Sequence, residues 1–347
     1  MKRSSPDHRL ALEPETRQVD EKPQPESQPA GKPEATPAPR AAEVDEQADK
    51  SAAAPKREAG LFVAVGFGLR RLVSSDGIHW EHEEEQVDFR NDKNFELRGA
   101  THGNGLILGV GGGLKTLVLT TRDGKEWKDM SVDQGFMSDA AYGNGVFVGV
   151  GFQGMYRSPD GLKWTERSRV PPATWRRVAY GNGKFVATGA SHDANAEGWT
   201  AASADGQRWT TAKVADGKFP RNIAFGNGRF VLVGSHGLRE SSTDGEKWQD
   251  RTLGEKEETL SGITWAGDRF VAIGDRGAYS SKDGLTWEKL PNKPNLVLIC
   301  HGNQRFVGSR GQSLYYSSDG VDWKLAETKS KIQINKIIYV EGRAEAP

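Results

Sequence analysis

The sequence predicts an all-β protein, namely a seven-bladed β-propeller of four-stranded antiparallel blades, preceded by a disordered N-terminal tail. Three observations predict it: a motif that occurs seven times, a Gly/Asn-rich turn that precedes most of its copies, and a C-terminal segment that completes the first copy. The composition agrees, because 42 Gly and 10 Trp among 347 residues suit short strands, tight turns and a few large core side chains.

The first observation is the motif [S/T]-x-D-G-x-x-W, which recurs every 36 to 47 residues, from SSDGIHW (74–80) to SSDGVDW (317–323). Asp-Gly accepts positive φ and closes a tight hairpin. We expect the Asp carboxylate and the Ser/Thr hydroxyl to bond within the loop, and the Trp to start the last strand and fill the space beneath the turn. The motif is therefore predicted to be structural rather than catalytic, in the pairs Asp76 and Trp80, Asp123 and Trp127, Asp160 and Trp164, Asp205 and Trp209, Asp244 and Trp248, Asp283 and Trp287, and Asp319 and Trp323.

The second observation is a hairpin such as AAYGNGVFVGVG, in which an aromatic residue or His precedes a Gly/Asn turn and a β-rich run follows it. Together the two patterns give four short antiparallel strands about every 40 residues, which is the signature of a propeller blade. His102 and His301 occupy the aromatic position and are interpreted as packed histidines. Cys300 aligns with small alanines and is interpreted as a core thiol.

The third observation concerns the two ends of the repeat region. The first copy, AGLFVAVGFGLRRLVSSDGIHW, lacks its first strand, whereas INKIIYVEGR near the C-terminus resembles a first strand without partners. Residues 333–343 are therefore predicted to supply the inner strand of the first blade, so that the ring closes without an exposed sheet edge. The propeller is expected to span residues 61–347.

Residues 1–60 differ from the rest of the chain, because they hold nine of the sixteen Pro and no aromatic residue. Such a stretch cannot bury enough apolar surface to fold, so it is predicted to be a disordered Pro/Ala/Glu-rich segment. It is either an inert tail or a tether to a membrane or wall. MKRSSPDHRL has no apolar signal core, which indicates a cytoplasmic protein, or a periplasmic or extracellular one whose signal precedes the given sequence.

Charge and cysteine content exclude several classes of function. The formal net charge is zero, which argues against a nucleic-acid-binding protein. No apolar run approaches the roughly 18 residues that span a bilayer. A single cysteine excludes an internal disulfide. We expect no cofactor and no metal, and a monomeric chain.

The repeats resemble the BNR or Asp-box propellers, a group that includes sialidases, sortilin-type receptors and photosystem II assembly-factor propellers. The resemblance covers residues 61–343. The usual box is S-x-D-x-G-x-x-W, and all seven copies here lack the residue between Asp and Gly. This variant is similar to the SxDGxxW repeats of bacterial propellers. The resemblance implies the fold rather than an activity.

The variable loops are the predicted place for ligand binding, because the Gly/Asn and Asp-Gly turns share one face of the ring and the variable connections share the other. The candidate ligand-binding residues on that face are Arg157, His192, Trp199, His236, Arg239, Arg276 and Arg310. Arg157, Arg239, Arg276 and Arg310 are expected at similar loop positions, where they either form a basic rim at the channel mouth or remain solvated loop charges.

The sequence therefore predicts a non-enzymatic binding or scaffold propeller that recognises a protein, a peptide or a surface glycan. The alternative is a sialidase-like glycan-processing hydrolase. That activity needs an arginine triad, a Tyr/Glu pair, an acidic acid/base and normally an RIP motif. The sequence contains no RIP motif. Three arginines beside a Tyr and a carboxylate in the channel mouth would favour the hydrolase.

Overall fold

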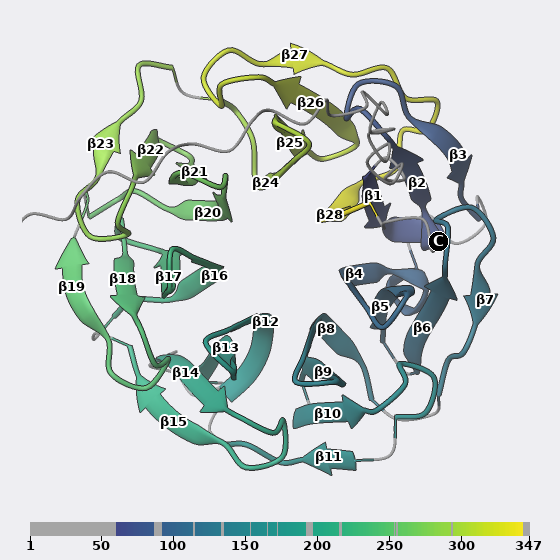
Figure 1. Ribbon diagram of the computed structural model, residues 1–347, viewed down its shortest axis with the longest axis horizontal. Coiled ribbons are helices and arrows are strands. Elements are labelled where there is room, and N and C mark those ends of the chain that lie inside the picture. Colours follow the sequence, from purple (N-terminus) through teal and green to yellow (C-terminus); the bar gives the residue numbers. More distant parts are fainter. Residues whose placement is uncertain are drawn as a thin grey trace, which may run out of the picture. The chain divides into compact units, whose positions relative to one another are not determined.

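The computed structural model describes residues 60–86, 92–113, 115–132, 135–152, 154–164, 166–171, 173–191, 197–214, 217–252, 254, 256–292 and 294–342. The predicted disorder of residues 1–59 and the prediction for His192 lie outside these residues. The described chain forms seven four-stranded antiparallel sheets around a central channel (Figure 1). The predicted seven-bladed fold is confirmed.

Within each blade, the strands follow one another from the channel outward. Blade 1 contains β28 (Ile334–Val340), β1 (Leu61–Gly66), β2 (Arg71–Ser74) and β3 (Glu81–Glu84). Blade 2 contains β4 (Leu97–Gly103), β5 (Leu106–Gly112), β6 (Thr116–Thr121) and β7 (Lys128–Asp129). Blade 3 contains β8 (Met137–Gly143), β9 (Val146–Gly151), β10 (Gly154–Ser158) and β11 (Glu166–Ser168). Blade 4 contains β12 (Ala173–Gly181), β13 (Lys184–Ser191), β14 (Gly198–Ser203) and β15 (Thr210–Lys213).

The remaining three blades follow the same order. Blade 5 contains β16 (Pro220–Gly226), β17 (Arg229–Gly234), β18 (Arg239–Ser242) and β19 (Gln249–Thr252). Blade 6 contains β20 (Leu260–Trp265), β21 (Phe270–Gly274), β22 (Ala278–Ser281) and β23 (Glu288–Lys289). Blade 7 contains β24 (Leu298–Gly302), β25 (Arg305–Arg310), β26 (Ser313–Ser317) and β27 (Lys324–Leu325). Two short 3₁₀ turns, η1 (Phe67–Leu69) and η3 (Lys93–Phe95), complete the described elements.

The ring closes as the repeat ends predict. β28 pairs antiparallel with β1, with Tyr339 opposite Phe62 and Ile337 opposite Ala64. Arg70 is fully buried beside this seam and donates to Glu83 and to backbone carbonyls of blade 7 and its connection to β28. The C-terminal strand therefore removes the sheet edge that β1 would otherwise expose.

The Asp-Gly motifs are hydrogen-bonded loops, as predicted. In blade 1, the Asp76 Oδ1 atom accepts the N–H groups of Ile78 at 2.8 Å and His79 at 2.9 Å. The Ser74 hydroxyl donates to Asp76 and accepts the N–H of Gly77 at 2.8 Å. The same bonds from backbone N–H groups hold the pKa of several motif carboxyls below its ordinary value, at Asp123, Asp160, Asp205 and Asp319.

The motif tryptophans pack less deeply than predicted. Among the seven, only Trp164 is buried, with 3% of its surface exposed, and the other six are partly exposed. The Nε1 atom of Trp164 donates to the Gly161 carbonyl at 3.2 Å, whereas that of Trp248 donates to Thr200 of the neighbouring blade at 3.0 Å. The reason is position: the last strand is the outer edge of each blade, so one face of the indole meets solvent.

The Gly/Asn turns link neighbouring blades. Their asparagines adopt positive φ of 44–46°, as tight hairpin turns require. Asn144 also donates to the Gly183 and Ala204 carbonyls of the next blade, both at 2.9 Å. His301 packs on Phe306 with ring centroids 4.6 Å apart, as predicted. The prediction for His102 is wrong, because this side chain is exposed.

The aromatic residues before these turns also pack between blades. A Cβ atom added to Gly143 would lie 2.2 Å from the ring of Tyr180, and one on Gly226 would lie 2.3 Å from Trp265. The missing glycine side chains therefore make room for an aromatic ring of the next blade. One face of each ring remains at the channel, since these aromatic side chains are half-buried.

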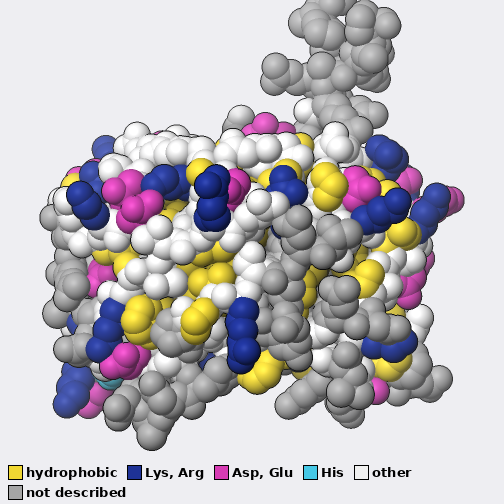
Figure 2. All heavy atoms as spheres, turned by 90° about the horizontal axis from the view of Figure 1, so that it is seen from below, with side chains coloured by type: hydrophobic (Ala, Val, Ile, Leu, Met, Phe, Trp, Pro, Cys, Tyr) yellow, Lys and Arg dark blue, Asp and Glu magenta, His cyan; other side chains and the backbone are white. Residues whose placement is uncertain are grey.

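Seen edge-on, the outer wall of the ring carries basic and acidic side chains intermixed, with hydrophobic side chains between them (Figure 2). None of the described helices is long and apolar enough to cross a membrane.

Candidate binding site at the channel mouth

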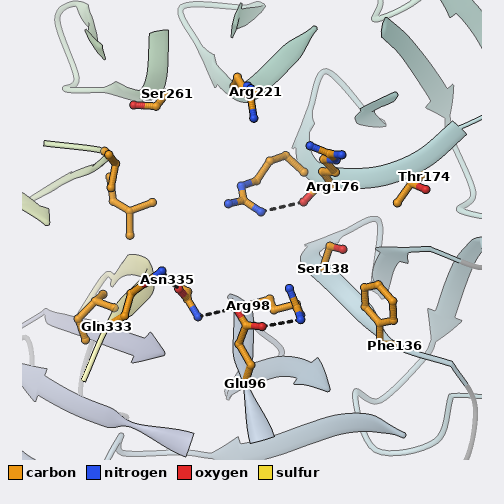
Figure 3. A pocket seen from close by; sticks show the side chains of 14 residues that line it. Glu96, Arg98, Phe136, Ser138, Thr174, Arg176, Arg221, Ser261, Gln333 and Asn335 are labelled. Carbon is orange, nitrogen blue, oxygen red and sulfur yellow. Dashed lines mark hydrogen bonds and ion pairs between the residues drawn. The ribbon is translucent and has the colours of Figure 1, made fainter. Parts of the chain in front are cut away.

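The candidate site is a cavity of about 520 Å³ in the channel, at the end where the inner strands begin. The variable connections between blades lie at this end, because all inner strands run in the same direction through the ring. The lining side chains come from the inner strands of several blades and converge on the axis (Figure 3).

One structural feature places these side chains. In six blades the inner strand has a β-bulge near its start, and the extra residue is left out of the pairing register. A bulge re-aims the side chain it carries. In order around the ring, the bulged residues are Asn335, Arg98, Ser138, Arg176, Arg221 and Ser261. All six line the cavity, and we call them, with Val297 at the same position in blade 7, the bulge ring.

A glycine at the end of the second strand accompanies each bulge. A Cβ atom on Gly111 would lie 1.9 Å from the Glu96 carbonyl oxygen, and one on Gly189 would lie 2.2 Å from the Thr174 carbonyl oxygen. Blade 7 has Arg310 at this position, and its inner strand pairs without a bulge. The bulge thus depends on a second-strand residue that has no side chain.

Three arginines give the cavity its charge: Arg176 and Arg177 on β12 and Arg221 on β16. Among the described residues, no carboxylate forms an ion pair with any of them. Arg177 donates to the Arg176 carbonyl at 2.9 Å. Partial desolvation, and then the charges of Arg221 and Arg177, lower the pKa of Arg176 from its ordinary value. The positive charges of Arg177 and Arg221 therefore repel that of Arg176, and a bound anion would relieve this repulsion.

The carboxylates near the cavity are already paired. Glu96 forms an ion pair with Arg98 and accepts a hydrogen bond from Asn335 at 3.1 Å. One layer deeper, Lys336 pairs with Asp139 at 2.9 Å, and Asp139 is only 1% exposed. The positive potential of the three unpaired arginines is therefore not cancelled from within the cavity.

Apolar side chains border the same mouth. Only three large hydrophobic side chains of the described residues are exposed, and two of them lie here: Phe152 at 49% and Val297 at 40%. Phe152 stacks on Phe136, with centroids 6.0 Å apart, and Phe136 and Val297 line the cavity. Arg98 lies 5.3 Å from the Phe136 ring centroid. The mouth thus combines cationic and apolar surface.

Two of the predicted ligand-binding arginines lie elsewhere than expected. Arg157 belongs to strand β10, not to a loop, and donates to the Asp205 carbonyl in the Asp-Gly turn of the next blade at 3.1 Å. Arg239 is buried at 4% exposure, pairs with Glu258 at 3.0 Å and stacks on Tyr279 at 3.8 Å. The expected rim of four equivalent arginines is therefore wrong in its geometry, because two of the four are committed to neighbours.

The other predicted residues are dispersed. Arg276 pairs with Glu257 at 3.0 Å, and Arg310 is exposed at the end of β25. Trp199 is partly buried against the core of blade 4, and His236 lies in the β17–β18 turn with a φ of 56°. None of these residues lines the described cavity. A role for them in ligand binding stays a prediction.

Sequence reasoning missed the bulge ring, although a signal for it exists. Counting four residues back from the aromatic position of each repeat gives the seven members of the ring in turn. The glycine that ends the second strand identifies the blades with a bulge. Arg176, Arg177 and Arg221 lie near the starts of β12 and β16, next to the connections expected on the variable face, so this arginine-lined cavity opens at the predicted face.

No cluster of three or more His, Cys, Asp or Glu side chains among the described residues is arranged to hold a metal ion. The Cys300 thiol is buried, which raises its pKa to about 12 and keeps it protonated.

No protein-family model and no curated protein matches this chain. Among solved structures, a YCF48 protein bound to D1 peptide is similar, with a TM-score of 0.54 and 17% identity over 72% of this chain and 85% of that chain. YCF48 from Cyanidioschyzon merolae has a TM-score of 0.54 and 16% identity over 76% of this chain and 91% of that chain. At such low identity, these likenesses concern the fold alone.

Proposed function

We propose that this protein is a non-enzymatic propeller that binds an acidic segment of a protein or peptide at the mouth formed by the bulge ring. The observation that carries the proposal is the set of three arginines, Arg176, Arg177 and Arg221, which have no carboxylate partner among the described residues. Guanidinium groups bind carboxylates through paired hydrogen bonds, and their fixed geometry favours planar anions.

The apolar rim supports a peptide rather than a simple anion. Phe152 and Val297 are exposed at the same mouth, and exposed hydrophobic side chains next to a charged pocket are typical of interaction sites. A segment with carboxylates facing Arg176 and Arg221 and an apolar side chain on Phe136 and Phe152 would match both surfaces. A neutral surface glycan would leave the arginines without a partner.

Fold-level precedent points the same way. One propeller of similar fold is described as bound to D1 peptide. That likeness is an analogy of fold and does not identify the partner of this chain.

The sialidase-like alternative is not favoured. Three arginines do meet in the channel mouth, but the residues described as lining this cavity include no tyrosine, and their single carboxylate, Glu96, pairs with Arg98. Glycoside hydrolysis needs two carboxyl groups placed on either side of the scissile bond.

The proposal is tested with a fluorescein-labelled peptide of Glu and Leu residues and its Gln/Leu counterpart, by anisotropy titration of the full chain. We expect the acidic peptide to bind and its affinity to fall with added salt. The Gln/Leu peptide should bind poorly. Replacing Arg176 and Arg221 together by Gln should weaken binding by at least about tenfold, because each hydrogen bond to a charged group contributes about 1.5–3 kcal/mol.

The matched control removes two positive charges from the Asp-Gly face, as Arg122→Gln with Arg208→Gln. Both side chains are exposed there, and this variant should bind the acidic peptide as the parent does. Equal losses in the two double variants would mean that the peptide responds only to overall charge, and the proposal would be wrong.

A further inference from the structure

The channel has a second cavity at its other mouth, beside the Gly/Asn turns. Its volume is about 480 Å³, and half-buried rings of Phe225, Trp265, His301 and Tyr339 contribute to its lining. Isoleucines of the inner strands and the buried, protonated Cys300 thiol lie deeper. Its size is that of small-molecule sites, which measure about 300–1,000 Å³, and its lining combines aromatic, aliphatic and polar side chains.

The aromatic residues at this mouth have a structural role that leaves part of each ring available. Three of the four rings cover a glycine of the preceding blade on one side: Phe225 covers Gly181, Trp265 covers Gly226 and Tyr339 covers Gly302. These side chains are half-buried and line the cavity, so part of each ring is exposed there. Burial lowers the pKa of His301, so its ring is neutral at neutral pH and adds aromatic rather than charged surface.

The charge in this cavity lies at its deep end. Arg177 and Lys336 line it there, and Lys336 is already paired with Asp139 at 2.9 Å. The guanidinium of Arg177 thus provides the net positive charge at this depth. Glu341 is the acid of the lining, and it is exposed at the outer edge, where solvent screens it.

We infer that this second mouth is a binding site for a small aromatic anion, with the rings of the rim around its body and its acidic group directed to Arg177. The aromatic lining provides apolar and stacking contact, and the guanidinium provides the one charged partner inside. This site opens at the end of the channel opposite to the proposed peptide site, and the two cavities share Arg177 between them.

The test uses 8-anilinonaphthalene-1-sulfonate, an aromatic anion whose fluorescence rises in apolar surroundings, and the uncharged N-phenyl-1-naphthylamine. We expect saturable binding of the anion at one site per chain. Arg177→Met should weaken binding of the anion by about tenfold, which corresponds to the loss of one hydrogen bond to a charged group. The same variant should change the affinity for the neutral dye by less than about twofold. Equal effects on both dyes, or no saturable binding to the parent, would overturn the inference.

Two further variants locate the dye. Ala224→Phe and, should that variant fold poorly, Thr264→Phe fill the second cavity and should abolish binding of the anion while acidic-peptide binding persists. Arg221→Gln, at the opposite mouth, should weaken binding of the acidic peptide and leave binding of the anion unchanged. If dye binding is lost with Arg221→Gln and persists in both cavity-filling variants, the dye binds among the arginines of the first cavity. The second site would then be rejected. Failure of peptide binding in the parent, with dye binding intact, would affect the proposed function alone.

Discussion

At the scale of single residues, the seven motif aspartates are occupied by their own loops. In each described copy the carboxylate accepts two backbone N–H groups ahead of it, for example Lys247 and Glu246 on Asp244, both at 2.9 Å. A carboxylate held in this way stays ionised, and its Oδ1 atom is occupied by the loop. The repeated acid therefore explains the turn and not an activity.

The motif tryptophans should contribute unequally to stability. Trp164→Ala should lower the free energy of unfolding by about 3–5 kcal/mol, because it deletes a fully buried indole. Trp209 makes the same bond to its turn glycine, at 3.2 Å, but is partly exposed, so Trp209→Ala should cost clearly less. Urea titrations of both variants measure the difference. Equal costs would show that the turn bond, rather than burial, sets the contribution.

At the scale of the strand, the bulge and its glycine act as one device. The extra residue of the inner strand moves a backbone carbonyl into the space that a second-strand side chain would fill. The seven blades provide an internal comparison, because Arg310 replaces the glycine in the one blade whose inner strand has no bulge. This device turns a structural repeat into a ring of variable side chains at the channel.

Removing this glycine should disturb the site as well as the fold. Gly189→Ala would bring a Cβ atom within 2.2 Å of the Thr174 carbonyl oxygen, next to Arg176. We expect a loss of about 1–3 kcal/mol from overpacking, together with weaker binding of the acidic peptide. Gly109→Ala is the control, since its nearest neighbours lie at 3.5 Å and blade 4 carries Ala187 at the same position. Similar effects of the two substitutions on binding would contradict the role given to the bulge.

At the scale of the molecule, the ring and its site depend on the last strand. β28 completes blade 1, and its Asn335 belongs to the bulge ring and holds Glu96. The net charge is zero, yet three unpaired arginines collect at one mouth of the channel while the outer wall is mixed in sign (Figure 2). The distribution of charge, and not its sum, is what a ligand meets.

Deleting residues 330–347 should therefore lower both the melting temperature and peptide binding. The deletion leaves β1 without its inner partner and exposes a sheet edge, so several kcal/mol or solubility should be lost. A chain that ends at residue 342 retains the whole of β28 and is the control. Thermal unfolding and gel filtration compare the two chains. If the chain without residues 330–347 has the same melting temperature as the parent, closure of the ring by β28 is disproved.

The sequence by itself determined the repeat, the turns and the closure, because these follow from local rules: Asp-Gly and Asn-Gly set the backbone, and an incomplete first copy needs a partner strand. It also indicated the face at which the arginine-lined cavity opens. Tertiary structure decided which arginines meet there. Arg157 and Arg239 are equivalent to loop cations in sequence, but in the folded ring Arg157 donates to the Asp205 backbone carbonyl and Arg239 pairs with the Glu258 carboxylate. Each bulge belongs to a single repeat, but the convergence of the bulged side chains on one axis depends on the neighbouring blades, and so it is a property of the closed ring.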